Sequence, residues 1–272
     1  TYHSPIVMDR SRSSSIVSSV SENNPAILVT RQATSPFNHV FITNIIADLC
    51  VISSKTREGA SILPLYQDRS AKKSNISEDV LNSLNGALKT KIKAEQIFYY
   101  VYAILFSTKY RTDYESSLLI DFPKIPFTKK EKIFTELSKL GKELADAHLL
   151  QTQSLSITSV YPKSGSNIVS SKIEYDEKES RVYINGEQYF TEISPEIWEF
   201  KIGPNQVLKK WLKVKKNQTL SVKHIITWQK IVSAIHQTIC ILPKIDKIFP
   251  SVTQNLFSIT KNEKIPKLDD FA

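Results

Sequence analysis

The stretch Ile97–Phe106 reads IFYYVYAILF and is the longest apolar run in the chain. It is about half of the roughly 20 residues that a membrane-spanning helix needs, so it predicts a buried helix. Residues 78–107 contain one Gly and no Pro, and apolar residues recur at helical spacing. This pattern predicts two helices, or one helix broken near Gly86. Ser77, followed by two acidic residues, is a typical helix N-terminus.

The flanking segments predict short strands upstream and a second helix downstream. Upstream, the short apolar runs favour strands separated by loops, and they cover residues 26–29, 40–46, 49–52 and 62–66. Downstream, Thr128 and Glu131 have the spacing of a capping box. Apolar residues then follow one helical face over Lys130–Leu150.

The C-terminal half changes from a strand pattern back to a helical one. Residues 154–190 alternate like a β-meander, and Asn185–Gly186 predicts a tight two-residue hairpin with positive φ at both positions. A short helix is expected around 207–212, and a longer one over 225–242 that Pro243 ends. A weaker helix over 244–259, broken at Pro250, would follow.

These patterns predict an α+β fold, with a short-strand lobe and a β-meander packed on a helical scaffold. Residues 1–272 are expected to form one domain. Its expected lobes are strand and loop at 1–70, helical at 71–153, β-meander at 154–203 and helical at 204–272.

The composition indicates a basic intracellular chain. The 272 residues include 36 Lys and Arg against 27 Asp and Glu, a net charge of +9, as expected of a chain that meets polyanions or of one with a solvated positive surface. Cys50 and Cys240 are the only cysteines and lie far apart, which favours a reducing, cytoplasmic compartment. A start at Thr1 with Met8 as the sole methionine suggests a fragment of a longer polypeptide.

No catalytic, cofactor-binding or metal-binding residues are expected. The six glycines are too scattered for a phosphate-binding loop, and no Asn/Asp-Pro-Pro-aromatic sequence of an amino-methyltransferase occurs. The histidines lack metal-ligand spacing, so His148 and His236 are interpreted as structural. One alternative is a Mg²⁺-dependent nuclease fragment using Asp176, Glu199 and Lys201. Another is a non-catalytic helical scaffold for protein interaction.

Donor side chains beside the predicted strands suit DNA recognition. Arg pairs bidentately with guanine, and Asn or Gln with adenine. The candidate DNA-binding residues are Arg10, Arg12, Arg31, Gln32, Asn38, His39, Lys55 and Arg57. A solvated rim is the alternative for the set, and a buried structural salt bridge is the alternative for Arg31. A second basic face surrounds Trp211 and serves solubility or phosphate contact; it comprises Lys209, Lys210, Lys213, Lys215 and Lys216.

Ten sequence blocks follow one another over nearly the whole chain, as far as Lys261. They are AILVTRQ from Ala26, FNHVFIT from Phe37, ILPLY from Ile62, IFYYVYAIL from Ile97, Tyr110-Arg111, DFPKIP from Asp121, LGKEL from Leu140, His148-Leu149, WEFKIG from Trp198 and QVLKKWL from Gln206. In order and spacing these blocks resemble the C-terminal part of single-polypeptide type ISP and related type IIG restriction-modification enzymes, which fuse helicase or nuclease modules to an adenine methyltransferase.

The resemblance implies a target recognition domain that follows the methyltransferase domain. Such a domain binds double-stranded DNA beside the methyltransferase of the same polypeptide, contacts no membrane and does no catalysis itself. S-adenosylmethionine, Mg²⁺ and, where a motor is present, ATP would serve the parent enzyme. Because specificity loops differ between members, the base readers are expected in the non-matching segments Ser11–Asn24 or Ser154–Ser171.

Overall fold

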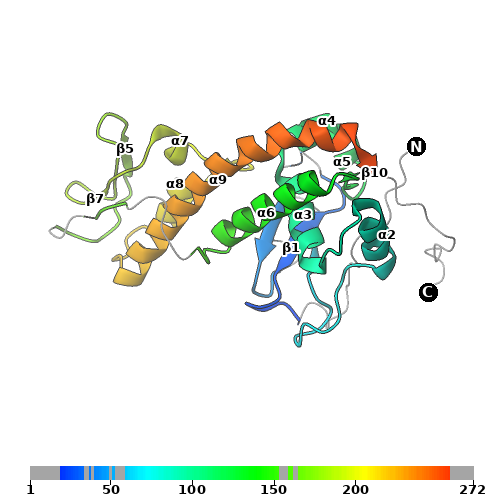
Figure 1. Cartoon of the computed structure of the whole chain (residues 1–272). Coiled ribbons are helices and arrows are strands. Elements are labelled where there is room, and N and C mark those ends of the chain that lie inside the picture. The colour runs from blue at the N-terminus through cyan, green and yellow to red at the C-terminus, as the bar shows by residue number, and fades with distance from the viewer. Residues whose placement is uncertain are drawn as a thin grey trace.

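Two hydrophobic cores, joined by one long helix, organise the α+β fold that the sequence predicted (Figure 1). The structure is a computed structural model that describes residues 19–33, 37, 40–48, 51–52, 59–152, 159–161 and 165–257. The first core collects residues between 27 and 145 together with 241–252. The second collects residues between 169 and 235.

A small antiparallel sheet packs on the first core, with strand order β2-β1-β3. Its strands are β1 (Ala26–Thr30), β2 (Val40–Thr43) and β3 (Ala60–Pro64). The central strand β1 is buried along its whole length. The register pairs Thr30 with Ala60 and Val29 with Val40. The C-terminal end of β1 and the N-terminal ends of β2 and β3 therefore lie at the same end of the sheet.

The helices of the first core follow the sheet. They are α2 (Glu78–Leu88), α3 (Ala94–Phe106), α4 (Thr108–Asp113), α5 (Glu115–Leu118) and α6 (Glu131–His148). The apolar run of α3 is buried as predicted, and α6 packs along it. The break between α2 and α3 lies at Lys89, which has a φ of 54°, and not at Gly86. Gly86 is exposed inside α2, where a helix tolerates it.

The predicted capping box at the start of α6 is wrong. Lys130 is the N-cap residue of α6 and makes no side-chain cap. Thr128 instead belongs to β4 (Phe127–Thr128), which pairs with β10 (Leu256–Phe257). Its hydroxyl oxygen accepts a hydrogen bond from the backbone N–H of Lys130 at 3.1 Å. Thr128 is therefore not the N-cap of α6, because β4 pairs with β10 from the other end of the chain.

The second core contains the predicted meander. Its elements are β5 (Glu174–Asp176), β6 (Arg181–Tyr183), β7 (Tyr189–Phe190), α7 (Pro195–Trp198), β8 (Lys201–Ile202), β9 (Asn205–Gln206) and α8 (Val207–Val214). The strands pair in the order β5-β6-β7, and Val182 and Phe190 are buried. Phe190 stacks on Trp228, with ring centroids 4.5 Å apart.

The two-residue hairpin predicted at Asn185–Gly186 is wrong, because neither residue has a positive φ. Residues 184–188 form a longer connection, in which Ile184 donates its N–H to the carbonyl of Gln188 at 3.0 Å. The side-chain oxygen of Asn185 accepts the N–H groups of Glu187 and Gln188 at 2.9 and 2.8 Å. Its amide group donates to the carbonyls of Ser166 and Ile168. Asn185 therefore acts through its side chain and needs no left-handed backbone.

The long helix α9 (Val222–Gln254) runs through Pro243 and Pro250, so the prediction that Pro243 ends it is wrong. Proline removes one backbone hydrogen bond, but each end of α9 is held by a different core. Trp228 and Val232 belong to the second core, and Ile245 and Phe249 to the first. Packing on both cores outweighs the local cost of proline, and α9 changes direction along its length (Figure 1).

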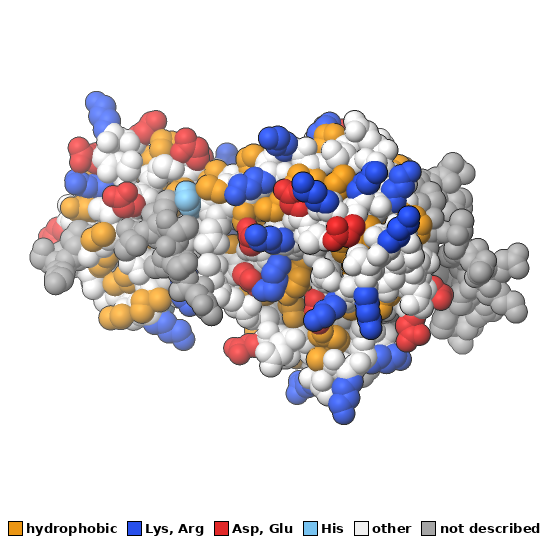
Figure 2. All heavy atoms as spheres, viewed as in Figure 1, with side chains coloured by type: hydrophobic (Ala, Val, Ile, Leu, Met, Phe, Trp, Pro, Cys, Tyr) orange, Lys and Arg blue, Asp and Glu red, His pale blue; other side chains and the backbone are white. Residues whose placement is uncertain are grey.

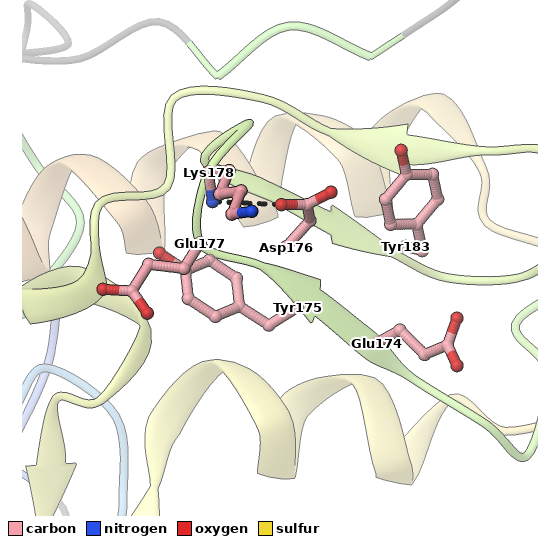
Figure 3. A pocket seen from close by; sticks show the side chains of 6 residues that line it. All are labelled: Glu174, Tyr175, Asp176, Glu177, Lys178 and Tyr183. Carbon is pink, nitrogen blue, oxygen red and sulfur yellow. Dashed lines mark hydrogen bonds between the residues drawn. The ribbon is translucent and has the colours of Figure 1, made fainter.

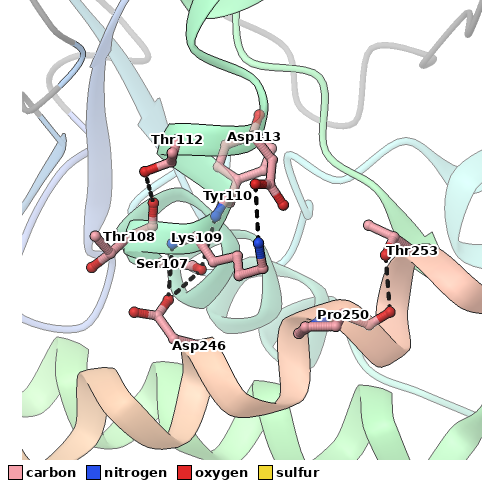
Figure 4. A network of polar contacts seen from close by, with 9 residues as sticks. All are labelled: Ser107, Thr108, Lys109, Tyr110, Thr112, Asp113, Asp246, Pro250 and Thr253. Carbon is pink, nitrogen blue, oxygen red and sulfur yellow. Dashed lines mark hydrogen bonds and ion pairs between the residues drawn. The ribbon is translucent and has the colours of Figure 1, made fainter.

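A polar network fastens the C-terminal part of α9 to α4 (Figure 4). Asp246 accepts the hydroxyl of Ser107 at 2.6 Å and the backbone N–H of Lys109 at 3.2 Å. On the next turns, Thr253 donates its hydroxyl to the carbonyl of Pro250 at 2.9 Å.

Among the described residues, α9 is also the one helix that is long and apolar enough to cross a membrane by length and composition. Core helices of soluble proteins pass the same test.

Candidate nucleic-acid interface

Arg31 and Gln32 lie at the sheet edge where β1 ends. Arg31 Nε contacts Asp121 Oδ1 at 3.1 Å, and the side chains are 58% and 52% exposed. Gln32 donates its side-chain amide to the carbonyl of Ile120 at 3.0 Å. The predicted alternative of a buried salt bridge for Arg31 is therefore wrong, since the pair is exposed. The backbone N–H of Phe122, together with Arg31, holds the pKa of Asp121 below its usual value.

The other sequence-predicted site residues lie outside the described residues; they are Arg10, Arg12, Asn38, His39, Lys55 and Arg57. Phe37 is buried in the first core. Tyr66 donates its hydroxyl to Glu95 at 2.5 Å, and burial together with this bond raises the pKa of Tyr66 to about 12. Phe37 is therefore a core residue, and Tyr66 packs against the same core.

The outward face of the meander is a candidate surface that sequence reasoning did not resolve to residues. Val182 and Phe190 point into the core, so Arg181, Tyr183 and Tyr189 lie on the opposite face. The Arg181 guanidinium lies 4.6 Å from the ring centroid of Tyr189 and pairs with Glu179 at 3.3 Å. The alternation of residues 181–183 was the signal that could have found this face.

An open hollow of about 610 Å³ lies beside this face (Figure 3). Six residues line it: Glu174, Tyr175, Asp176, Glu177, Lys178 and Tyr183. Asp176 accepts the backbone N–H groups of Lys178 and Glu179 at 3.0 and 3.2 Å, which closes the turn between β5 and β6. The hollow therefore combines three carboxylates, two phenol rings and one lysine beside a hydrogen-bonded turn.

Asp176 and Glu199, the carboxylates of the nuclease alternative, do not form a metal site in the described structure. Glu199 lies in contact with Gln206 Nε2 at 3.5 Å, and Asp176 is engaged in its turn. Across the described part of the chain, no three His, Cys, Asp or Glu side chains are grouped to hold a metal ion. Both carboxylates therefore have structural hydrogen bonds to make.

The basic face around Trp211 lies on α8 and the turn that follows. Leu208 and Leu212 are buried, and Trp211 packs on Trp228 with ring centroids 5.6 Å apart. Lys215 Nζ lies 5.0 Å from the centroid of the Trp211 ring. The apolar side of α8 thus faces the second core, and its lysines face outward.

His148 has the structural role that its sequence context predicted. Thr238 donates its hydroxyl to the carbonyl of Ala234, so it accepts from His148 Nε2 at 2.9 Å. His148 Nδ1 then accepts the hydroxyl of Tyr102 at 2.6 Å. Burial, with the nearby charge of Arg111, lowers the pKa of His148 to about 4. The neutral ring therefore links α3, α6 and α9.

Comparison with known proteins identifies the class of this domain. Residues 1–243 match the family described as the type ISP C-terminal specificity domain, and the chain belongs to this family. Its function is that of a DNA target specificity domain in a restriction-modification enzyme. No curated protein matches the chain by sequence.

Three solved structures share the fold. The ATP-dependent type ISP restriction-modification enzyme LlaBIII, bound to DNA, is 22% identical with a TM-score of 0.59, over 83% of this chain and 16% of that one. A nuclease-deletion mutant of the type ISP enzyme LlaGI, in complex with a DNA substrate mimic, is 20% identical with a TM-score of 0.57, over 82% of this chain and 18% of that one. The DrdV chain of a DrdV–DNA complex is 22% identical with a TM-score of 0.61, over 83% of this chain and 24% of that one. The chain thus spans less than a quarter of each of these enzymes.

Proposed function

We propose that this chain grips duplex DNA and fixes its register, so that a methyltransferase domain of the same polypeptide receives the target adenine. The family match over residues 1–243 carries this proposal, and DNA is present in the solved complexes of LlaBIII and DrdV. An enzyme that modifies a base extrudes it from the stack, so a second domain must hold the duplex. The net charge of +9 favours phosphate binding.

Of the residues proposed to contact DNA, Arg31 and Gln32 lie in the part of the chain that the structure describes. Their present partners are surface groups, and an exposed ion pair such as Arg31–Asp121 contributes at most about 1 kcal/mol. A bidentate contact between arginine and guanine discriminates by about 1–3 kcal/mol. Displacing Asp121 therefore costs little, so that Arg31 is available for a base edge. The same proposal includes Arg10, Arg12, Asn38, His39, Lys55 and Arg57, some of which flank this edge in sequence.

The meander is the second element that we place at the groove. Stacking on Tyr189 holds the Arg181 guanidinium in one orientation before any ligand arrives. Such preorganisation reduces the entropy lost on binding. Glu179, Tyr183 and Arg181 offer an acceptor, an aromatic ring and a bidentate donor on one short ribbon. Strands of this kind can enter the major groove and contact base edges.

The parent enzyme supplies the chemistry in this proposal. Residues 1–272 act as one non-catalytic recognition domain, with the four lobes predicted from the sequence. S-adenosylmethionine, Mg²⁺ and, in an ATP-driven enzyme such as LlaBIII, ATP would be used by other domains of a cytoplasmic polypeptide.

Fluorescence anisotropy of the 272-residue chain with labelled duplex DNA tests the proposal. We expect binding that weakens as salt rises from 50 to 200 mM, as phosphate contacts require. Arg31→Ala should weaken or relax recognition while changing the free energy of unfolding by less than about 1 kcal/mol, the value of an exposed pair.

Asp121→Asn is the matched control, because it breaks the same ion pair but leaves the Arg31 guanidinium free. It should bind DNA at least as tightly as the wild type. If Arg31→Ala unfolds the domain, or if both variants lose binding equally, Arg31 is structural and not a reader. A wild-type chain that ignores duplex DNA at 50 mM salt would refute the proposed function itself.

A further inference from the structure

Charge is segregated between two consecutive stretches that share the second core. Residues 174–199 contain eight Asp and Glu and two Lys and Arg. Residues 201–245 contain nine Lys and no Asp or Glu, although acidic residues make up 27 of the 272. A merely solvated surface usually mixes the two signs, whereas a basic stretch without acidic residues favours contact with a polyanion. On the face drawn in Figure 2, Asp and Glu predominate at the meander end, while Lys and Arg spread over α6 and the C-terminal half of α9.

Five of the nine lysines lie on α8 and the turn after it, and we call them the α8 lysine face: Lys209, Lys210, Lys213, Lys215 and Lys216. Among the described residues, none of the five forms an ion pair. Lys210, Lys213 and Lys216 are exposed. No acidic residue lies three or four positions away in sequence that could neutralise them within the helix.

The backbone under this face is rigid. Trp211 packs on Trp228, which has no exposed surface, and Leu208 and Leu212 are buried beside them. Lys215 lies over the Trp211 ring. The lysines therefore project from a fixed helix, which lowers the entropy lost when they bind.

The turn after α8 is hydrogen-bonded to the segment that leads into the meander. Val169 donates to the carbonyl of Gln218 at 3.0 Å, and Asn217 donates to the carbonyl of Val169 at 2.8 Å. Leu220 donates to the carbonyl of Asn167 at 2.9 Å. Segment 167–169 belongs to the Ser154–Ser171 stretch in which base readers are expected. An anchor on the α8 lysine face would thus hold the exposed residues Gly165, Ser166 and Ile168 at a fixed distance from the lysines.

We propose that the α8 lysine face binds the phosphate backbone of duplex DNA and sets the register of residues 165–168, which precede the buried Val169, against the groove. Five ammonium groups on an unneutralised face complement a phosphate backbone, and such contacts position a protein without reading sequence. This inference rests on the proposed function. It names the surface that provides affinity for DNA, whereas the residues that contact base edges provide the sequence specificity.

The test compares two triple variants of equal charge in anisotropy titrations from 50 to 200 mM salt. One is Lys210→Gln, Lys213→Gln and Lys216→Gln on the α8 lysine face. The control is Lys129→Gln, Lys132→Gln and Lys139→Gln, three exposed lysines at and within α6. Each phosphate contact contributes about 0.9 to the slope of log K against log salt. The α8 variant should lose about 2.7 from this slope, so its affinity relative to wild type should rise about 40-fold over the fourfold salt range.

The control variant should lose less than about 0.9, the slope of one contact. A third variant with arginine at positions 210, 213 and 216 keeps the charge and should restore the wild-type slope, which separates lost contacts from a damaged helix. Equal slopes for the α8 variant and wild type, or an equal loss in the control, overturn the inference and leave the proposed function intact. A wild-type chain that does not bind duplex DNA refutes both.

Discussion

Replacing Gly141 with alanine should destabilise the first core, although alanine is the better helix former. Gly141 lies within α6, at the place where α6 crosses α3. A Cβ atom added there would lie 2.0 Å from the carbonyl oxygen of Tyr99 and 3.1 Å from the Cβ of Ala103. The first contact is with backbone, so no side-chain rotation relieves it. The two helices would have to separate by about an ångström.

The magnitude follows from two opposing effects. Alanine gains about 1 kcal/mol over glycine inside a helix. Overpacking a core typically costs about 1–3 kcal/mol, and more where backbone must move. A gap of 0.5–1 Å also removes about a quarter to a half of the dispersion energy of each contact it opens. Because the clash is with backbone, we take the upper end of the overpacking cost, about 3 kcal/mol, and subtract the gain of about 1 kcal/mol; Gly141→Ala should then lower the free energy of unfolding by about 2 kcal/mol.

Gly86→Ala is the matched control, because Gly86 lies in α2 with nothing within 4 Å of an added Cβ. It should stabilise the chain by up to about 1 kcal/mol. Urea unfolding followed by far-ultraviolet circular dichroism measures both changes. All three tryptophans belong to the second core or pack against it, so their fluorescence reports separately whether that core unfolds together with the first. Gly141→Ala with wild-type or higher stability would refute the close-approach argument.

Substitutions at two further positions test polar contacts between helices. The pKa of His148, about 4, lies below the value of 6.5 for a free histidine, so the unfolded chain binds a proton that the folded chain does not; stability should fall by up to about 3 kcal/mol between pH 6.5 and 4. His148→Gln should flatten the pH dependence of the urea midpoint in this window, and an unchanged slope would contradict the assignment. Asp246→Ala removes the acceptor of the Ser107 hydroxyl and of the Lys109 N–H at the start of α4 and should cost about 0.5–2 kcal/mol in thermal unfolding, whereas Asp246→Asn keeps an acceptor and should cost less.

Local pattern was sufficient wherever burial follows periodicity. The buried helix over Ile97–Phe106, the amphipathic face of α6 and the strands of the meander were all predicted and are confirmed. Arg31 and Gln32 were predicted as DNA-binding residues beside an apolar strand; the structure places them directly after β1 with exposed side chains, and their DNA contacts stay a prediction. The outward face of the meander was missed at residue level, because only the strand register decides which side chains point to solvent.

The sequence by itself determined the fold class, the positions of most helices and strands, the basic character and the family. Only the tertiary structure decided what becomes of Pro243, Thr128 and Asn185. In each case a local preference met a partner distant in sequence: two cores keep α9 helical through its prolines, β10 pairs with Thr128, and segment 166–168 binds the Asn185 side chain. Local propensities amount to about 1–3 kcal/mol, and tertiary contacts of similar or larger energy reverse them. The pattern of one segment contains no information about those partners.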